Sequence, residues 1–156
     1  MLLLRALLAV AVLPGVFAGV LPWIIAARDP WRGEGSDLGA IVLGAGVGVL
    51  VLCVRDFLLA GRGTLAPWDA PRHLVVVGLY RYVRNPMYVG VLLIVCGTAI
   101  VTGSPEVAAY GAIVAIAFHL RVVHYEEPVL ARQFPDDWPV YAAKVSRWMP
   151  RPPARD

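Results

Sequence analysis

The residues best suited to chemistry lie in one short stretch, Gly78–Gly90, which reads Gly-Leu-Tyr-Arg-Tyr-Val-Arg-Asn-Pro-Met-Tyr-Val-Gly. Asn85 is a favoured helix N-cap, and Pro86 suits the first helical position because the N–H that it lacks would have no partner there. The free N–H groups of a helix start attract anions. Arg84 adds a planar guanidinium that binds carboxylate or phosphate through two nitrogens. The stretch predicts an anion site; a basic, aromatic anchor at a membrane surface is the alternative reading.

A pair of acids, Glu126 and Glu127, forms the second candidate group. The apolar runs Pro86–Thr102 and Glu106–His124 are separated by a short Gly-Ser-Pro turn, so they predict a helical hairpin. A hairpin returns its two ends to the same face of a membrane. We therefore expect the two acids to lie near Arg84.

His124 is a third candidate because of its backbone. Pro128 has no N–H to donate to the carbonyl of His124, which leaves that carbonyl open to a ligand amine or to water. The sequence contains no HExxH motif, and its two cysteines stand apart in apolar runs. We therefore expect no metal site.

The elements that must position these residues belong to a membrane protein. Hydrophobic residues make up 59% of the 156-residue chain and charged residues only 16%, against about 25% in soluble domains. The net charge of +3 needs no nucleic acid, because scattered arginines at an inner membrane surface explain it equally well. The length suits a single membrane domain, residues 1–156.

The apolar pattern predicts an all-α integral membrane helical bundle of about four transmembrane helices with short C-terminal amphipathic helices. For the first apolar run, Met1–Ala27, a cleaved signal peptide is the alternative to a transmembrane helix. If this run is a helix, Pro14 is expected to kink it. The connection Gly61–Val77 is either a binding loop or a surface linker. The expected spans are Met1–Ala27, Leu38–Val54 running on to Leu59, Pro86–Thr102 and Glu106–His124, and the expected amphipathic helices are residues 129–134 and Tyr141–Trp148.

Charge predicts the orientation. The connection between the second and third spans holds four arginines against one aspartate, and the tail holds five Lys or Arg residues, whereas the other loops are acidic or uncharged. The positive-inside rule then places both termini and the Arg84 region in the cytoplasm. The bias toward Ala, Val, Arg and Gly indicates a bacterium, so we expect the bacterial inner membrane.

Four fragments occur in an order that is familiar: Gly-Arg-Gly-Thr-Leu-Ala-Pro-Trp, the Gly78–Gly90 stretch, Tyr-Glu-Glu-Pro-Val-Leu-Ala-Arg-Gln-Phe, and Arg147-Trp148-Met149-Pro150. Together they resemble the isoprenylcysteine carboxyl methyltransferase and phospholipid methyltransferase superfamily of integral membrane proteins. The resemblance covers residues 61–151, which divides the domain into two N-terminal spans (1–60) and a methyltransferase-like hairpin, loop and C-terminal helices (61–151).

The resemblance implies an enzyme that holds S-adenosylmethionine in a cytosol-facing cavity and methylates a lipophilic or membrane-associated carboxylate, thiol or amine. Arg84 and Glu127 are the expected catalytic residues, with no nucleic-acid partner and with membrane lipids around the site. Asn85 departs from the family pattern, because His is common there; Pro135, Trp138 and Ser146 depart from it further along. The residues expected to contact the cofactor are Tyr80, Asn85, Tyr88, His124, Glu126 and Glu127.

Two competing readings remain. A membrane reductase of the sterol reductase type, dependent on NADPH, is similar over the same C-terminal hairpin, but has an Arg-Asp-Glu run where this chain has His-Tyr-Glu-Glu-Pro. The other reading is a non-catalytic membrane protein on the same scaffold, against which the intact Arg84, Tyr88 and Glu127 argue.

Overall fold

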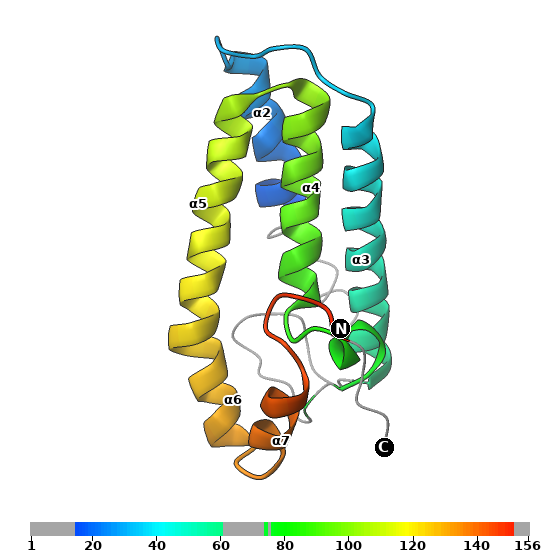
Figure 1. The fold of residues 1–156 in the computed structure, drawn as a ribbon, viewed down its shortest axis with the longest axis vertical. Helices are drawn as coiled ribbons and strands as arrows, with labels where there is room; N and C mark the ends of the chain where they lie inside the picture. The colour runs from blue at the N-terminus through cyan, green and yellow to red at the C-terminus, as the bar shows by residue number, and fades with distance from the viewer. Residues whose placement is uncertain (1–14, 61–73, 75, 152–156) are drawn as a thin grey trace.

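The computed structural model describes residues 15–60, 74 and 76–151, which form a bundle of upright helices (Figure 1). The described part of the chain is all-helical, as predicted, and its one β-type pairing is a single bridge between Val83 and Ser146. The elements are η1 (Gly15–Val20), α2 (Leu21–Arg28), α3 (Leu38–Ala60), η2 (Gly78–Arg81), α4 (Pro86–Thr102), α5 (Pro105–Arg121), η3 (Val122–Glu126), α6 (Glu127–Gln133) and α7 (Asp137–Lys144).

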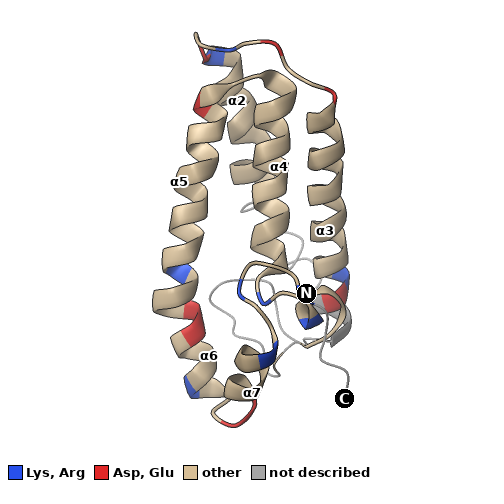
Figure 2. Ribbon diagram, viewed as in Figure 1, with Lys and Arg blue, Asp and Glu red and all other residues tan. Residues whose placement is uncertain are grey.

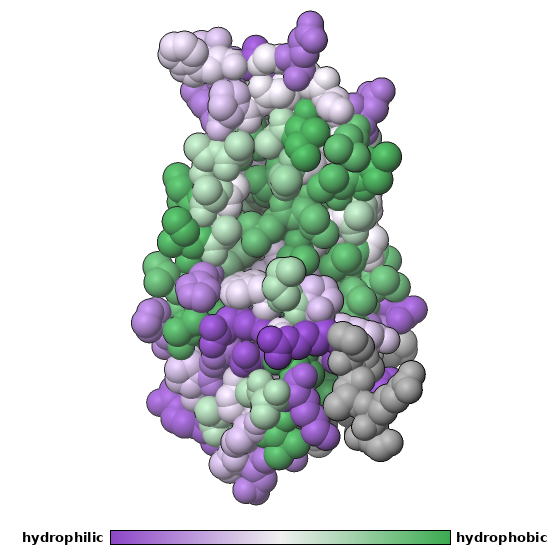
Figure 3. Space-filling view, in the orientation of Figure 1, coloured by the Kyte–Doolittle hydropathy of each residue, from purple (hydrophilic) through white to green (hydrophobic). Residues whose placement is uncertain are grey.

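Among the described residues, two helical segments are long and apolar enough to cross a membrane, Leu38–Asp56 and the continuous helix Pro105–Gln133. Gly15–Arg28 and Pro86–Thr102 are apolar but shorter, so two of the four expected spans coincide with helices of membrane-spanning length. A hydrophobic band separates two polar ends of the molecule (Figure 3). The kink expected at Pro14, and most of the Gly61–Val77 connection, lie outside the described residues.

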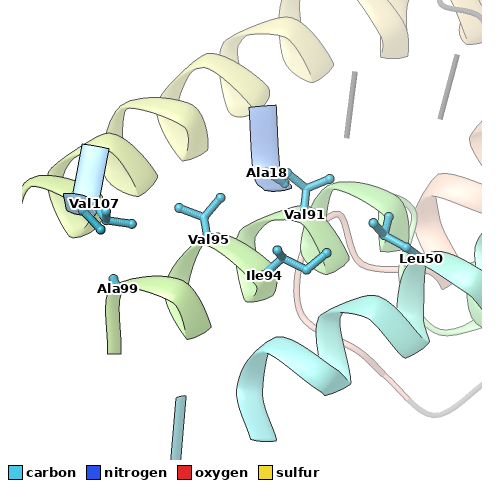
Figure 4. Packing of buried hydrophobic residues seen from close by; sticks show 8 residues of the cluster. Ala18, Leu50, Val91, Ile94, Val95, Ala99 and Val107 are labelled. Atoms are coloured by element: carbon cyan, nitrogen blue, oxygen red, sulfur yellow. The ribbon is translucent and has the colours of Figure 1, made fainter. Parts of the chain in front are cut away.

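Helix α4 lies at the centre of the core. Its buried side chains Val91, Ile94, Val95 and Ala99 share one core cluster with residues from neighbouring helical elements (Figure 4). Those partners are Ala18 of η1, Ala26 of α2, Leu50 of α3 and Val107 of α5. The position of the whole hairpin is therefore fixed through α4.

Glycines bring α3 and α4 into close contact. A Cβ on Gly46 would lie 2.7 Å from the carbonyl oxygen of Gly90, and a Cβ on Gly97 would lie 2.4 Å from the backbone nitrogen of Leu43. Gly44 and Gly48, which flank Gly46, face open space. Of the three glycines Gly44, Gly46 and Gly48, only Gly46 therefore allows the close packing of α3 against α4.

At the end of the bundle far from Arg84, Asp29 ties the α2–α3 loop to the hairpin turn. Its carboxylate accepts hydrogen bonds from the Ser104 hydroxyl, from the Trp31 N–H (2.8 Å) and from the Glu106 N–H (3.1 Å). Ser104 in turn caps α5 by accepting from the Val107 N–H at 3.2 Å. Burial raises the pKa of Asp29, but these hydrogen bonds outweigh it and leave the pKa below its ordinary value.

The C-terminal helices differ from the prediction. The expected separate helix after Pro128 is continuous with α5, because the π-helical turn η3, in which the Glu127 N–H reaches back to Val122 O, carries the chain past the proline. The last helix spans Asp137–Lys144 rather than Tyr141–Trp148. It ends there because Val145 is extended and leads into the bridge made by Ser146.

Candidate active site at the polar end of the bundle

Charged residues lie toward the two ends of the described helices and are absent from the middle of these helices (Figure 2). The end that holds the start of α4 carries the predicted site. Arg84 precedes α4, while Glu126 and Glu127 lie where η3 passes into α6. The predicted hairpin geometry, which returns the acids to the Arg84 end, is confirmed.

Glu127 is held by two arginines. Arg84 contacts its Oε1 at 2.9 Å, and Arg147 contacts Oε1 at 2.7 Å and Oε2 at 2.8 Å. The Arg84 and Glu127 side chains are only 13% and 16% exposed, so water weakens this contact less than it would on the surface. The two hydrogen bonds that Arg147 donates to Glu127 raise the pKa of Arg147, which stays charged. The buried Nε of Arg84 has no partner among the described residues.

Glu126 has a separate set of partners. It accepts hydrogen bonds from the Tyr88 hydroxyl and from Arg121 Nε, the latter at 2.8 Å. Arg121 also lies 5.3 Å from the centre of the Tyr125 ring. Arg121 and Glu126 are five residues apart, which a regular helix does not place together; the π-helical turn between them does. The adjacent acids are thereby pointed at different partners.

The segment after α7, residues 145–151, is named here the C-terminal strap; it passes in front of the start of α4 (Figure 1). The Arg84 N–H donates to Ser146 O at 2.8 Å, and the Arg151 N–H donates to Tyr82 O at 3.0 Å. Asn85 lies at the N-cap position, but its side chain does not cap α4 and instead donates to Arg147 O at 3.1 Å. The expected capping by the Asn85 side chain is therefore wrong; its amide holds the strap.

Three rings, named here the aromatic shelf, lie beside the acids: Tyr88, Phe118 and Trp148. The Tyr88 and Phe118 ring centres are 4.3 Å apart, and those of Tyr88 and Trp148 are 6.4 Å apart. The Trp148 N–H donates to Nδ1 of His119 at 3.2 Å, which fixes the indole against α5. Since Tyr88 also bonds Glu126, the shelf joins an apolar surface to a charged one.

Tyr80 and His124 lie apart from the ion pairs. The Tyr80 backbone oxygen accepts from the Tyr141 hydroxyl at 2.8 Å, and burial raises the pKa of the Tyr80 phenol far above its ordinary value. His124 is exposed on η3, and no side-chain contact to either acid is found for it among the described residues. The structure thus brings together Arg84, Asn85, Tyr88 and the two acids, but not His124.

Sequence reasoning missed Arg121 and gave Arg147 no role of its own. The signal for Arg121 was its place inside an otherwise apolar run, where a charged side chain needs a partner. Arg147 lies 20 residues after Glu127, and no local pattern links them. Three arginines against two carboxylates leave one positive charge in excess, and no metal-binding cluster of His, Cys, Asp or Glu occurs in the described part of the chain.

The sequence predicted a helical hairpin that brings paired acids near Arg84, and the structure adds the arginines that hold them. The profile described as "phospholipid methyltransferase" matches residues 38–137, well over half of the chain. The chain belongs to the phospholipid methyltransferase family. This membership implies methyltransferase activity in a membrane context. No curated protein and no solved structure matches the chain.

Proposed function

We propose that the protein is an S-adenosylmethionine-dependent methyltransferase that acts on a lipophilic or membrane-associated acceptor. The observation that supports this most strongly is the pair of acids, Glu126 and Glu127, which are adjacent in the chain, bound to different arginines and next to the aromatic shelf. Such a site offers carboxylates, a guanidinium and ring faces within one small region. The family generally uses this cofactor.

The residues present fit the cofactor's groups. A carboxylate suits Arg84, because its buried Nε has no partner within the residues that the structure describes and its place before α4 adds the positive end of the helix. An amine or ribose hydroxyl suits Glu127 or Glu126. Tyr88 offers a ring face to adenine or a sulfonium. Asn85 borders this region, while Tyr80, apart from the ion pairs, and His124, on the outside of η3, are the weakest of the proposed contacts.

When bound, S-adenosylmethionine supplies an electrophilic methyl group. The residues of this chain then need to align the acceptor and exclude water, which accounts for most of the rate when the acceptor is a carboxylate or thiolate. An amine acceptor must also lose a proton. Glu126, which lies beside the aromatic shelf, can accept that proton once it gives up its hydrogen bond from Tyr88 or Arg121. Arg84 and Glu127 are the proposed catalytic pair.

We place the site at the cytoplasmic face of a bacterial inner membrane, with both termini in the cytoplasm. The support is the excess of arginine on the side of Arg84 and the hydrophobic band above it (Figure 3). A reporter that is active only in the cytoplasm, fused after Asp156, is expected to be active. Activity of a periplasm-only reporter at that position would contradict the orientation.

The central experiment is binding of radiolabelled S-adenosylmethionine and of NADPH to the protein purified in detergent. We expect saturable binding of S-adenosylmethionine and none of NADPH. NADPH binding alone would favour a reductase, and binding of neither would favour a non-catalytic protein on this scaffold. Methyl transfer to long-chain carboxylate, thiol and amine probes would then identify the class of acceptor.

A further inference from the structure

Arg84 lies against a pair of aromatic rings on α7 that the site described above does not include. Its guanidinium carbon lies over the ring of Trp138, 5.7 Å from the ring centre. The rings of Trp138 and Tyr141 are 5.9 Å apart, and both residues are buried. Trp138 is also one of the residues at which this chain departs from the family pattern. The contact therefore joins the proposed catalytic arginine to a residue that has no role so far.

The indole of Trp138 has a defined position relative to the segment that carries Arg84. The Trp138 backbone N–H donates to the carbonyl of Phe134 at 2.9 Å, at the start of α7. Its ring belongs to one buried cluster with Tyr141. The Tyr141 hydroxyl donates to the backbone oxygen of Tyr80 at 2.8 Å, which ties α7 to η2, just before Arg84 in the chain.

The candidate site holds more positive than negative charge, and Trp138 meets part of this excess. Arg84, Arg121 and Arg147 face two carboxylates, and the Arg84 side chain is only 13% exposed. The face of an aromatic ring is negative, and tryptophan attracts a cation best among the aromatic side chains. Burial raises the pKa of Tyr141 to about 12, and the nearby positive charge of Arg84 opposes that shift. The guanidinium therefore lies beside both rings of α7.

A ring face stabilises an arginine without using its hydrogen-bond donors. The N–H groups of a guanidinium point outward in its plane, whereas a ring contacts the face of that plane. A carboxylate in the place of Trp138 would neutralise the charge, but it would also accept these N–H groups. Arg84 donates one terminal N–H to Glu127 at 2.9 Å, and its buried Nε has no partner in the part of the chain that the structure describes. The contact with Trp138 thus preserves a donor for a ligand.

We infer that Trp138 is a positioning residue for Arg84, because its indole holds the guanidinium in the orientation that leaves Nε for a ligand carboxylate. The inference rests on the proposed function, in which Arg84 binds a carboxylate of the cofactor or of the acceptor. Packing of α7 against its neighbours is the other role open to Trp138, and packing needs only an apolar side chain of similar volume. The two roles differ in whether the electron density of the ring matters.

The test replaces Trp138 with tryptophans that carry one, two or three fluorine atoms on the indole, introduced at that position alone. Fluorine withdraws electron density from the ring face but changes the shape of the ring little, so it weakens attraction for a cation and keeps the packing. Trp31, which is 74% exposed at the opposite end of the bundle, receives the same series as the matched control. We expect ligand binding to weaken stepwise in the Trp138 series alone, by at least about fivefold at three fluorines.

Two measurements on the detergent-purified protein distinguish the sources of the carboxylate. A fall in S-adenosylmethionine affinity assigns it to the cofactor, and a rise in KM for a carboxylate probe alone assigns it to the acceptor; either result supports the inference. Trp138→Tyr should retain more activity than Trp138→Leu at equal amounts of folded protein, because tyrosine keeps a ring face. Equal affinity and equal KM across the fluorinated Trp138 series would overturn the inference and leave Trp138 a packing residue.

Thermal unfolding of the same fluorinated proteins gives a readout that is independent of any ligand. Stability should fall with fluorination of Trp138 when Arg84 is present, and should not fall in the Arg84→Gln background, where the cation is absent. Equal falls in both backgrounds would overturn the contact. Failure of the unmodified protein to bind S-adenosylmethionine would overturn the proposed function, and this comparison would still decide whether Trp138 holds Arg84.

Discussion

Arg147 holds Glu127 through two parallel contacts, Nε to Oε1 at 2.7 Å and a terminal nitrogen to Oε2 at 2.8 Å. Arg84 meets the same Oε1 from the start of α4, at 2.9 Å. One carboxylate therefore connects three parts of the chain: α6, the start of α4 and the C-terminal strap. A ligand that binds Glu127 must share it with these arginines or displace one of them.

Glu127→Gln is expected to weaken binding of S-adenosylmethionine by about 1.5–3 kcal/mol, because a neutral amide cannot accept charge-assisted bonds. Isothermal titration in detergent measures the change. Asp137→Asn, an exposed acid in the first turn of α7, is the matched control and should leave binding unchanged. An unaltered isotherm for Glu127→Gln would return Glu127 to a purely structural role.

Gly46→Ala is expected to destabilise the bundle by about 1–3 kcal/mol, because its Cβ would lie 2.7 Å from the rigid carbonyl of Gly90. Gly48→Ala is the control on the same helix. No atom lies within 4 Å of its Cβ position, so alanine there should be neutral or stabilising by up to about 1 kcal/mol. Unfolding in mixed detergent and SDS checks both. Equal stability of the two variants would contradict the close α3–α4 contact.

The sequence predicted the hairpin, the helix start at Pro86 and the return of the acids to Arg84, because each depends on local features such as apolar length, Pro and Gly. It could not predict which arginines bind Glu126 and which bind Glu127. The pairing of Arg121 with Glu126 depends on the π-helical turn, and that of Arg147 with Glu127 depends on where the strap crosses α4. Asn85 shows the same limit, because its side-chain amide, expected to cap α4, instead donates to the carbonyl of Arg147, 62 positions later.

Asp29 is expected to make stability depend on acid pH. Its pKa is lower in the folded protein than in the unfolded chain, so its contribution is fully present above the unfolded value of about 3.9 and is lost as the pH falls through the folded pKa. Asp29→Asn should be less stable than wild type at neutral pH and should show a flatter stability profile below that value. Thermal unfolding across the acid range measures this, with Glu34→Gln, an exposed acid of the same loop, as the control. Parallel profiles for wild type and Asp29→Asn would remove Asp29 from this role.

Arg84→Lys is expected to lose most methyl transfer while the protein still inserts and folds. Arg84 uses one terminal nitrogen for Glu127, and its buried Nε has no partner in the described part of the chain, so its planar fork can bind a carboxylate while it still holds the acid. An ammonium is a point charge without that fork, although it retains the positive charge and can extend to the lipid head groups. Arg55→Lys is the matched control, since Arg55 is a largely exposed arginine at the same end of the bundle, paired to Asp56 at 2.7 Å. Turnover is measured at equal amounts of detergent-stable protein on any accepted probe. Rates for Arg84→Lys close to those of Arg55→Lys and wild type would show that Arg84 only anchors the chain at the membrane surface.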